Sequence, residues 1–219
     1  MWPSLPAKST REIDSYDALK NAIVSGALSP GERLVEEDLA RQFGIGRTAV
    51  RTALVRLEHD GLVNRQRNRG ASVRRVSEAE AVEILEARAA LESLAARHAA
   101  ARATRSQVRE LRAILTQMRK LLVKGDLLAI SERNATLHRR LLEISGHEAV
   151  QRICATLHSQ MVRFQFRTIL VPGRPERSLA EHSAIVEAVA QGDADAAERA
   201  MRRHLEHVTE ALRDAAANS

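Results

Sequence analysis

The stretch Gly44–Val63, GIGRTAVRTALVRLEHDGLV, reads as a short helix that is entered through glycine. Val50, Leu54 and Leu57 recur within it at helical spacing, which indicates one apolar face over about residues 47–59. The stretch is therefore predicted to be an amphipathic helix that packs on a small core, and the segments around it should supply that core.

Two arginines, Arg47 and Arg51, stand in the first turns of this helix and share a face with Thr48. Cations at a helix N-terminus are destabilising by roughly a few tenths of a kcal/mol, because the dipole and the free N–H groups are already positive there. An approaching phosphate would be attracted by all of these groups at once, and arginine also pairs with guanine in the major groove. The pattern favours a DNA-recognition helix, and the alternative is a solvated helix with ordinary surface arginines.

The segments on either side complete a small domain. Two more short helices are expected at about residues 15–25 and 36–43, separated by the turn sequence GALSPGERL. After the recognition helix, LVNRQRNRGASVRRV places apolar, β-compatible residues on both sides of a polar tip, as in a hairpin of two strands. This order predicts a winged helix-turn-helix over residues 16–76, preceded by a flexible arm over residues 1–15. The basic tip of the wing contains Arg65, Arg67, Asn68 and Arg69.

The charge of the chain is concentrated in the same region. The chain has 219 residues and a formal net charge of +6, and Arg47–Arg75 holds eight arginines against Glu58 and Asp60. A local excess of this kind indicates an anionic partner. Cys154 is the only cysteine and no segment has the apolar length of a membrane span, so we expect a cytoplasmic protein without a membrane partner.

Helical periodicity alone continues from Ser77, which forms an S-x-x-E capping box with Glu80. Only 2% of the residues are aromatic, whereas alanine, leucine, arginine and glutamate are abundant. The fold class is therefore mainly α, with an all-helical bundle over residues 77–219. Its six helices are expected at about residues 78–101, 105–124, 126–145, 147–170, 177–191 and 193–215.

Three histidines of this bundle lie on apolar helix faces. His138 follows Asn134 by one turn between Ile130 and Leu142, and two later helices each carry one further such histidine, His182 and His204. A single inward histidine is usually a satisfied core residue. Three on separate helices, one with a carboxamide a turn away, favour a metal or ligand site.

The segment LSPGERLVEEDLARQFGIGRTAVRTALVRLEHDGLVNRQRNRGASV closely resembles the N-terminal domain of GntR-type bacterial transcription regulators. The resemblance covers about residues 16–76 and implies a DNA interface made of Arg47, Thr48, Arg51, Arg67, Asn68 and Arg69. The chain departs from the family pattern at Gly46, Ala49 and Thr52, where serine, proline and glutamate are common. These departures weaken the helix start and remove a usual partner of a neighbouring arginine.

The helical region is similar to the FCD ligand-binding domain of the FadR subfamily, through ARAALESLAARHAA, NATLHRRLLEISGH and EHSAIVEAVAQGDADAAERAMRRHL. That resemblance implies a divalent metal, Zn²⁺, Ni²⁺ or Mn²⁺, beside a small carboxylate effector. The implied metal ligands are Asn134, which replaces the family's aspartate, with His138, His182 and His204. Candidates for holding the effector's carboxylate are Arg88, Arg163 and Arg167. A salt bridge to another helix, for example to Glu92, is the alternative role for these arginines.

Together these features predict an effector-responsive, sequence-specific regulator that binds a double-stranded DNA operator. We expect a homodimer on a pseudo-palindromic site, because one recognition helix reads too few base pairs for genomic specificity. Two other functions are the alternatives. A metal-dependent helical enzyme tethered to DNA would need a general base, and no H-E-x-x-H pattern is present. A nonspecific nucleoid protein would leave the inward histidines without a role.

Overall fold

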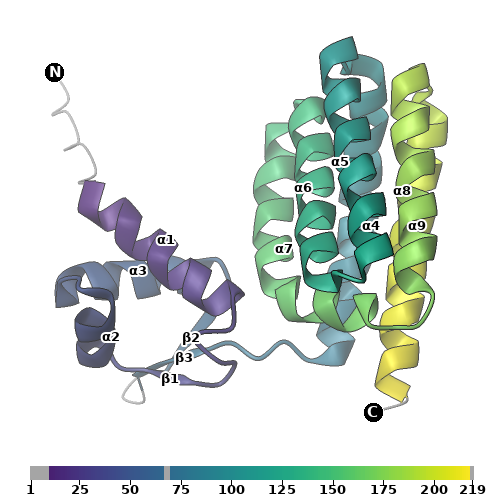
Figure 1. Ribbon diagram of the computed structural model, residues 1–219. Coiled ribbons are helices and arrows are strands. Elements are labelled where there is room, and N and C mark those ends of the chain that lie inside the picture. The colour runs from purple at the N-terminus through teal and green to yellow at the C-terminus, as the bar shows by residue number, and fades with distance from the viewer. Residues whose placement is uncertain (1–9, 67–69, 218–219) are drawn as a thin grey trace, which may run out of the picture. The chain divides into compact units, whose positions relative to one another are not determined.

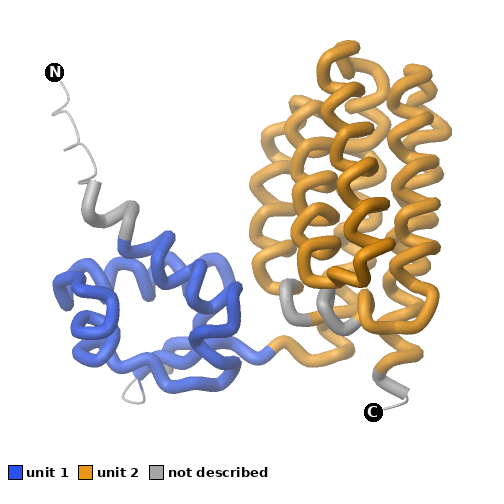
Figure 2. The backbone as a smooth tube through the Cα atoms, viewed as in Figure 1, with its two compact units in different colours: residues 1–75 blue, residues 76–219 orange. Residues whose placement is uncertain are grey.

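The chain divides into two units, residues 1–75 and residues 76–219 (Figure 2). Among the described residues, the first unit contains one hydrophobic cluster, and the second contains a large cluster and two smaller ones. The computed structural model describes residues 10–66 and 70–217. The wing tip, where Arg67, Asn68 and Arg69 were predicted to meet DNA, therefore lies outside the described residues.

The first unit is a winged helix-turn-helix (Figure 1). Gly44 takes a left-handed conformation with a φ of 65° between its second and third helices, which ends one helix and allows the sharp turn. The core beneath the turn is formed by buried residues such as Leu19, Leu54 and Leu57. In chain order the elements are α1 (Thr10–Val24), β1 (Arg33–Leu34), α2 (Glu36–Phe43), α3 (Arg47–His59), β2 (Val63–Gln66) and β3 (Gly70–Val73).

Two details of this unit differ from the sequence-based expectation. Helix α1 begins at Thr10, so part of the segment expected to be a flexible arm is helical. This is compatible with the sequence, because the residues that disfavour a helix most, proline and glycine, are absent between Pro6 and Gly26. The hairpin also gains a third strand, because β1 pairs with β3 in antiparallel register, Arg33 opposite Ser72. The strand order is β1-β3-β2. A strand of two residues is too short to leave a period-2 pattern in the sequence.

The second unit is a bundle of helices that lie side by side (Figure 1). Leucine, isoleucine, valine and alanine side chains from several of its helices form one continuous core. None of the helices in the described part of the chain is long and apolar enough to cross a membrane. The bundle contains α4 (Glu78–Arg102), α5 (Arg105–Lys124), α6 (Leu127–Ser145), α7 (Glu148–Ile169), α8 (Arg174–Gln191) and α9 (Ala194–Ala217).

Helix α4 packs against α6, α7, α8 and α9. Its buried face contains alanines such as Ala96 and Ala99, whose small side chains let neighbouring helices approach closely. Ser77 caps the helix by accepting a hydrogen bond from the backbone N–H of Glu80, as the sequence predicts. Helix α8 begins at Arg174, earlier than expected, because Gly173 ends the turn and Pro175 is tolerated in the first helical turn.

Candidate metal centre and nucleic-acid interface

Helix α3 presents the arginine face that the sequence predicts. Arg47, Thr48 and Arg51 are exposed, whereas Val50 and Leu54 on the other side are buried. Its N-cap is Gly46, which offers no side-chain acceptor, and its first turn contains no acidic residue. The N-terminal N–H groups of α3 thus remain available to an anion.

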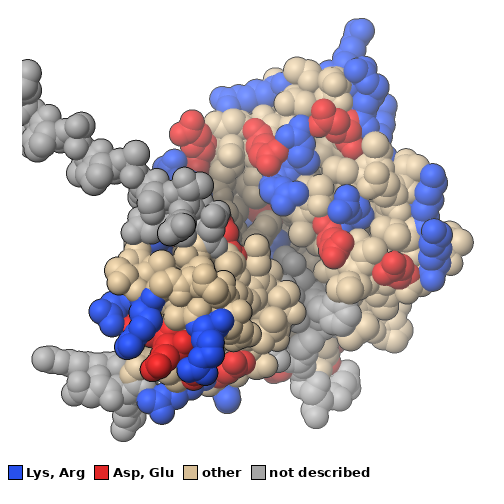
Figure 3. All heavy atoms as spheres, turned by 60° about the vertical axis from the view of Figure 1, so that its left-hand side comes forward, with Lys and Arg blue, Asp and Glu red and all other residues tan. Residues whose placement is uncertain are grey.

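Arg51 has an acidic partner in the structure. Its Nε lies 3.0 Å from Oε1 of Glu36 and its Nη2 lies 2.7 Å from Oε2, so the fork binds both carboxylate oxygens. This hydrogen bond, with the arginine's charge, lowers the pKa of Glu36. Glu36 is the first residue of α2, and the family-typical partner at position 52 is replaced by threonine. Figure 3 shows basic and acidic side chains lying beside one another on one face of this unit.

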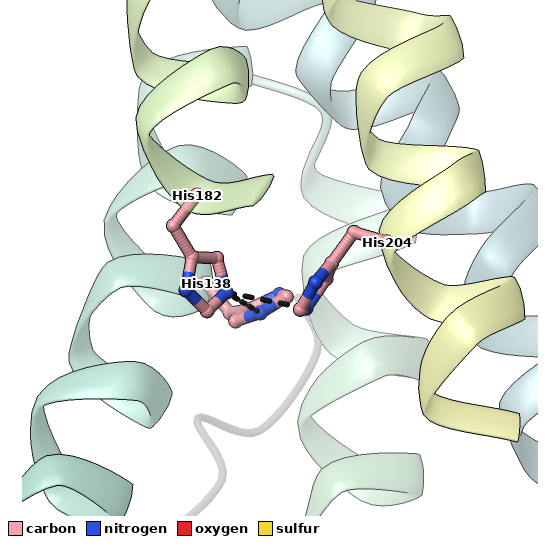
Figure 4. Close-up of side chains that lie close together, drawn as sticks. All are labelled: His138, His182 and His204. Atoms are coloured by element: carbon pink, nitrogen blue, oxygen red, sulfur yellow. Dashed lines mark hydrogen bonds between the residues drawn. The ribbon is translucent and has the colours of Figure 1, made fainter. Parts of the chain in front are cut away.

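Three imidazoles meet inside the helical unit. His138 comes from α6, His182 from α8 and His204 from α9, and their rings point toward one another (Figure 4). The Nε2 atom of His182 lies 3.3 Å from that of His138 and 3.2 Å from that of His204. Their side chains are only 2%, 0% and 2% exposed, respectively. The inward faces of three helices thus bring one histidine each to the same place in the bundle.

Two glutamates hold the outer nitrogens of these rings. Oε2 of Glu92 accepts from Nδ1 of His138 at 2.5 Å, and Oε2 of Glu181 accepts from Nδ1 of His204 at 2.6 Å. A carboxylate on Nδ1 keeps the proton there and turns the lone pair of Nε2 inward. This is the arrangement that orients histidine for a metal.

The three Nε2 atoms cannot satisfy one another. With Nδ1 protonated on His138 and His204, both of their Nε2 atoms are acceptors, and His182 between them can donate one proton to only one of them. Burial and the neighbouring imidazoles hold the pKa of His182 well below its usual value, which favours the neutral ring. Burial likewise lowers the pKa of His204. Neutral nitrogens within 4.8 Å of one another fit a divalent cation.

A cavity of about 50 Å³ adjoins the histidines. Asn134 lines it together with His138 and His204, so the residue in the family's aspartate position faces the same space as two of the rings. Apolar side chains such as Leu179 and Leu205 form much of the remaining wall. An apolar pocket with a few convergent polar groups is typical of a small-molecule site.

Of the three arginines predicted to hold the effector, the structure places only the side chain of Arg88. Arg88 lines the cavity, and its Nε also donates to Oε1 of Glu92 at 2.8 Å. Both residues belong to α4, so this ion pair lies within one helix and is not the bridge to another helix given as the alternative role. Arg163 and Arg167 belong to α7, but their side chains lie outside the described part of the structure. Arg174, which the sequence analysis did not single out, lines the cavity as well.

The pairing of the two glutamates with the histidines was not predicted from the sequence. Glu92 was considered only as a partner of an arginine, yet it also accepts from Nε2 of His158 at 2.9 Å. Burial by itself would raise the pKa of Glu92, but the charge of Arg88 and the two imidazoles outweigh it and hold the pKa well below its usual value. Glu181 directly precedes His182 in the sequence. Its position beside a candidate metal ligand is the one signal that could have identified it as a partner of the histidines.

Comparisons with known proteins agree with this architecture. The model of the bacterial regulatory proteins of the gntR family matches residues 14–73, and that of the FCD domain matches residues 83–207. The HTH-type transcriptional repressor RspR of Escherichia coli K12 is 30% identical over 198 residues, which cover 90% of this chain and 87% of that protein. The chain belongs to the gntR family and carries an FCD domain.

Other relatives of this gntR-family chain point the same way. The Uxu operon regulator of Haemophilus influenzae is 29% identical over 211 residues, covering 87% of this chain and 77% of its own. The structure of E. coli McbR/YncC has the same fold, with a TM-score of 0.80 and 22% identity over 94% of this chain and 98% of that one. The predicted family and fold class are thus confirmed. The protein is a DNA-binding transcription regulator and not an enzyme.

Proposed function

We propose that this regulator is a homodimer that binds a pseudo-palindromic operator in the cytoplasm and responds to a small organic acid. The observation that supports it most is the convergence of three Nε2 atoms, two of them on rings backed by buried or half-buried glutamates. His138, His182 and His204 would hold one divalent ion, Zn²⁺, Ni²⁺ or Mn²⁺. When bound, that ion supplies positive charge and open coordination positions for a carboxylate.

The chain's own residues would prepare the site for the acid. Glu92 and Glu181 fix the orientation of two rings, and apolar side chains line much of the adjoining cavity. Asn134 adds an uncharged amide oxygen, so it would act as a weak fourth ligand or hold a water molecule. Arg88, with Arg163 and Arg167 as further candidates, would add positive charge for the acid. Binding of the acid would shift an existing equilibrium between spacings of the two DNA-binding domains.

Metal content tests the first part of this proposal. The full chain, purified without chelators and without a histidine tag, is expected to contain about one equivalent of a divalent metal per chain by elemental analysis. Addition of Zn²⁺ or Ni²⁺ to chelator-treated protein should raise its melting temperature. Absence of metal together with an unchanged melting temperature would show that the histidines are core residues or contact the acid directly.

Asn134→Asp is expected to bind metal more tightly and the acid more weakly. A carboxylate adds a charged ligand, so metal affinity should rise on the order of tenfold, while one positive charge of the site is cancelled for the acid. Titration calorimetry with Ni²⁺, and then with acetate on the loaded protein, measures both changes. Asn134→Ala is the control, because it removes the amide without adding charge. An aspartate variant that binds Ni²⁺ no better than the parent would place residue 134 away from the ion.

On the DNA side, Arg47, Thr48 and Arg51 of α3 would contact bases and phosphates in the major groove. Arg67, Asn68 and Arg69 of the wing would contact the backbone or the adjacent groove. The arginines of α3 are exposed at the helix N-terminus, which supports this assignment, and the fold tolerates their positive charge because Glu36 neutralises one of them.

Replacing Arg47 or Arg51 by alanine is expected to cost about 1–3 kcal/mol of operator binding and to leave the fold intact. Arg51→Ala should cost more than Arg47→Ala, because it leaves the carboxylate of Glu36 uncompensated beside the DNA phosphates. Fluorescence anisotropy with the operator measures the loss. Arg41→Ala is a matched control, since Arg41 is an exposed arginine of α2 with a looser partner at 3.6 Å. Operator binding by both variants at the parent's affinity would mean that α3 is not the recognition helix.

A further inference from the structure

The guanidinium of Arg51 is bound along one edge and free at its end. Its Nε lies 3.0 Å from Oε1 and 3.1 Å from Oε2 of Glu36, and its Nη2 lies 2.7 Å from Oε2. Nη1 has no hydrogen-bond partner among the described residues. A guanidinium presents its N–H donors in one plane, so Glu36 occupies the edge formed by Nε and Nη2 and leaves the end formed by Nη1 and Nη2.

The carboxylate of Glu36 is held at a fixed place beside α3. Glu36 is the first residue of α2, and the residues on either side of it are anchored, because Leu34 is buried and paired in β1 and Leu39 is buried in the core. The first turn of α3 contains no acidic residue, so the carboxylate comes from another helix. Both helices pack on the same core, and Glu36 therefore orients Arg51 relative to the axis of α3.

Stability does not explain this ion pair. The side chain of Arg51 is 61% exposed and that of Glu36 is 27% exposed, and exposed pairs contribute little to folding. The hydrogen bond from Arg51 lowers the pKa of Glu36, and the charges of Arg51 and Arg47 act in the same direction, so the carboxylate stays ionised. A negative charge on a face that meets phosphates weakens binding to DNA of every sequence. Specificity explains such a residue, because discrimination is a difference between two affinities.

Recognition of guanine by arginine depends on orientation. The guanidinium has to place two donors opposite O6 and N7 in the plane of the base. An unrestrained arginine can do so with its edge or with its end, and it can also turn toward a phosphate. Glu36 blocks the edge, so only the end of Arg51 remains for a base. Restricting the side chain before it binds also lowers the entropy lost in the complex.

We propose that Glu36 is a positioning residue for base recognition, which holds the Nε–Nη2 edge of Arg51 so that the Nη1–Nη2 end meets a guanine of the operator. This inference rests on the proposed function, in which Arg51 contacts bases in the major groove. It adds a specificity-determining residue on α2. Glu36 acts through Arg51 and does not itself contact a base.

Selection from a pool of duplexes with a randomised central segment tests the proposal on the full chain. The parent is expected to select an operator in which at least one guanine depends on Arg51, so that Arg51→Ala no longer selects it. Glu36→Ala should select the same operator with that guanine replaced by mixed bases and with the other positions kept. The selection thus reads out the orientation of one arginine and not the stability of the domain.

Fluorescence anisotropy gives the size of the effect. The parent should bind the selected duplex about tenfold or more tightly than a duplex in which that G·C pair is replaced by A·T. In Glu36→Ala this ratio should fall to about threefold or less. Affinity for a duplex of unrelated sequence should stay the same or rise, because a negative charge beside the phosphates is removed. Melting temperatures establish that each variant is folded.

Glu37→Ala is the matched control. Glu37 is an exposed acidic residue of the same first turn of α2, so its removal changes the charge equally but leaves the contact to Arg51 in place. This variant should keep the parent's preference for guanine. An equal loss of preference in Glu37→Ala and Glu36→Ala overturns the proposal, because charge alone would then account for it.

Three other outcomes also decide the question. Glu36→Ala with the parent's preference for guanine overturns the positioning role, and so does a variant that binds all duplexes more weakly by the same factor. Loss of a cytosine preference in Glu36→Ala, with the guanine that depends on Arg51 retained, overturns it as well, because Glu36 would then read a base directly. Selection of the parent's operator by Arg51→Ala contradicts the proposed recognition by α3 instead.

Discussion

Glu92→Gln is expected to lower the free energy of unfolding of the helical unit by about 3–5 kcal/mol. Glu92 is 1% exposed and accepts from Arg88, His138 and His158. The amide keeps the volume of the side chain but removes the only carboxylate that pairs with Arg88 among the described residues, and a buried unpaired charge is costly. Urea denaturation of chelator-treated protein, followed by circular dichroism, measures the change without a contribution from bound metal.

Glu86→Gln is the matched control for this measurement. Glu86 lies on the same helix, α4, and pairs with Arg213 at 3.2 Å, but both side chains are more than half exposed. An exposed pair of this kind contributes about 0–1 kcal/mol. Equal losses in the two variants would mean that the network around Glu92 is no more important for stability than a surface ion pair.

His182→Gln is expected to abolish binding of Ni²⁺ or Zn²⁺, with a loss of affinity greater than about 100-fold. His182 is the central member of the cluster, because its Nε2 lies within 3.3 Å of both other Nε2 atoms. The amide of glutamine cannot replace an imidazole nitrogen at the same position and is a poorer ligand for these metals. Titration calorimetry and elemental analysis of the same preparations measure the loss.

His207→Gln is the control for the metal measurement. His207 also binds Glu181, but it is 42% exposed and its ring does not belong to the cluster. Metal binding by this variant should remain close to that of the parent. Retention of metal by His182→Gln at the parent's affinity would show that the ion, if present, is bound elsewhere.

Much of the fold follows from local signals in the sequence. Glycines at helix ends, such as Gly125 and Gly146, have positive φ and separate the helices where the sequence predicts. Arg174 shows where such signals fail. The segment VPGRP reads as a turn, but proline is compatible with a first helical turn, so α8 extends back to include Arg174 and places its side chain in the interior.

The site could be predicted only in part, for a similar reason. Helical periodicity shows that His138, His182 and His204 face the interior, because that property depends on each helix alone. Which glutamate meets which ring depends on how far one helix is shifted along another. Glu92 pairs with Arg88 four residues before it in α4, but no pattern in the sequence relates Glu92 to His138, which lies 46 residues away. The wing residues stay a prediction.

Helix α4 runs without interruption from the start of the helical unit to Glu92 beside the histidines. Its sequence from Glu78 to Arg102 contains neither glycine nor proline, so no residue of the types that usually kink helices interrupts its hydrogen-bond ladder. At 1.5 Å per residue, Glu92 lies about 20 Å along the helix axis from its first turn. That first turn begins three residues after Arg75, where the winged unit ends. A helix of this length without a kink converts a tilt at the cavity into a displacement of its first turn.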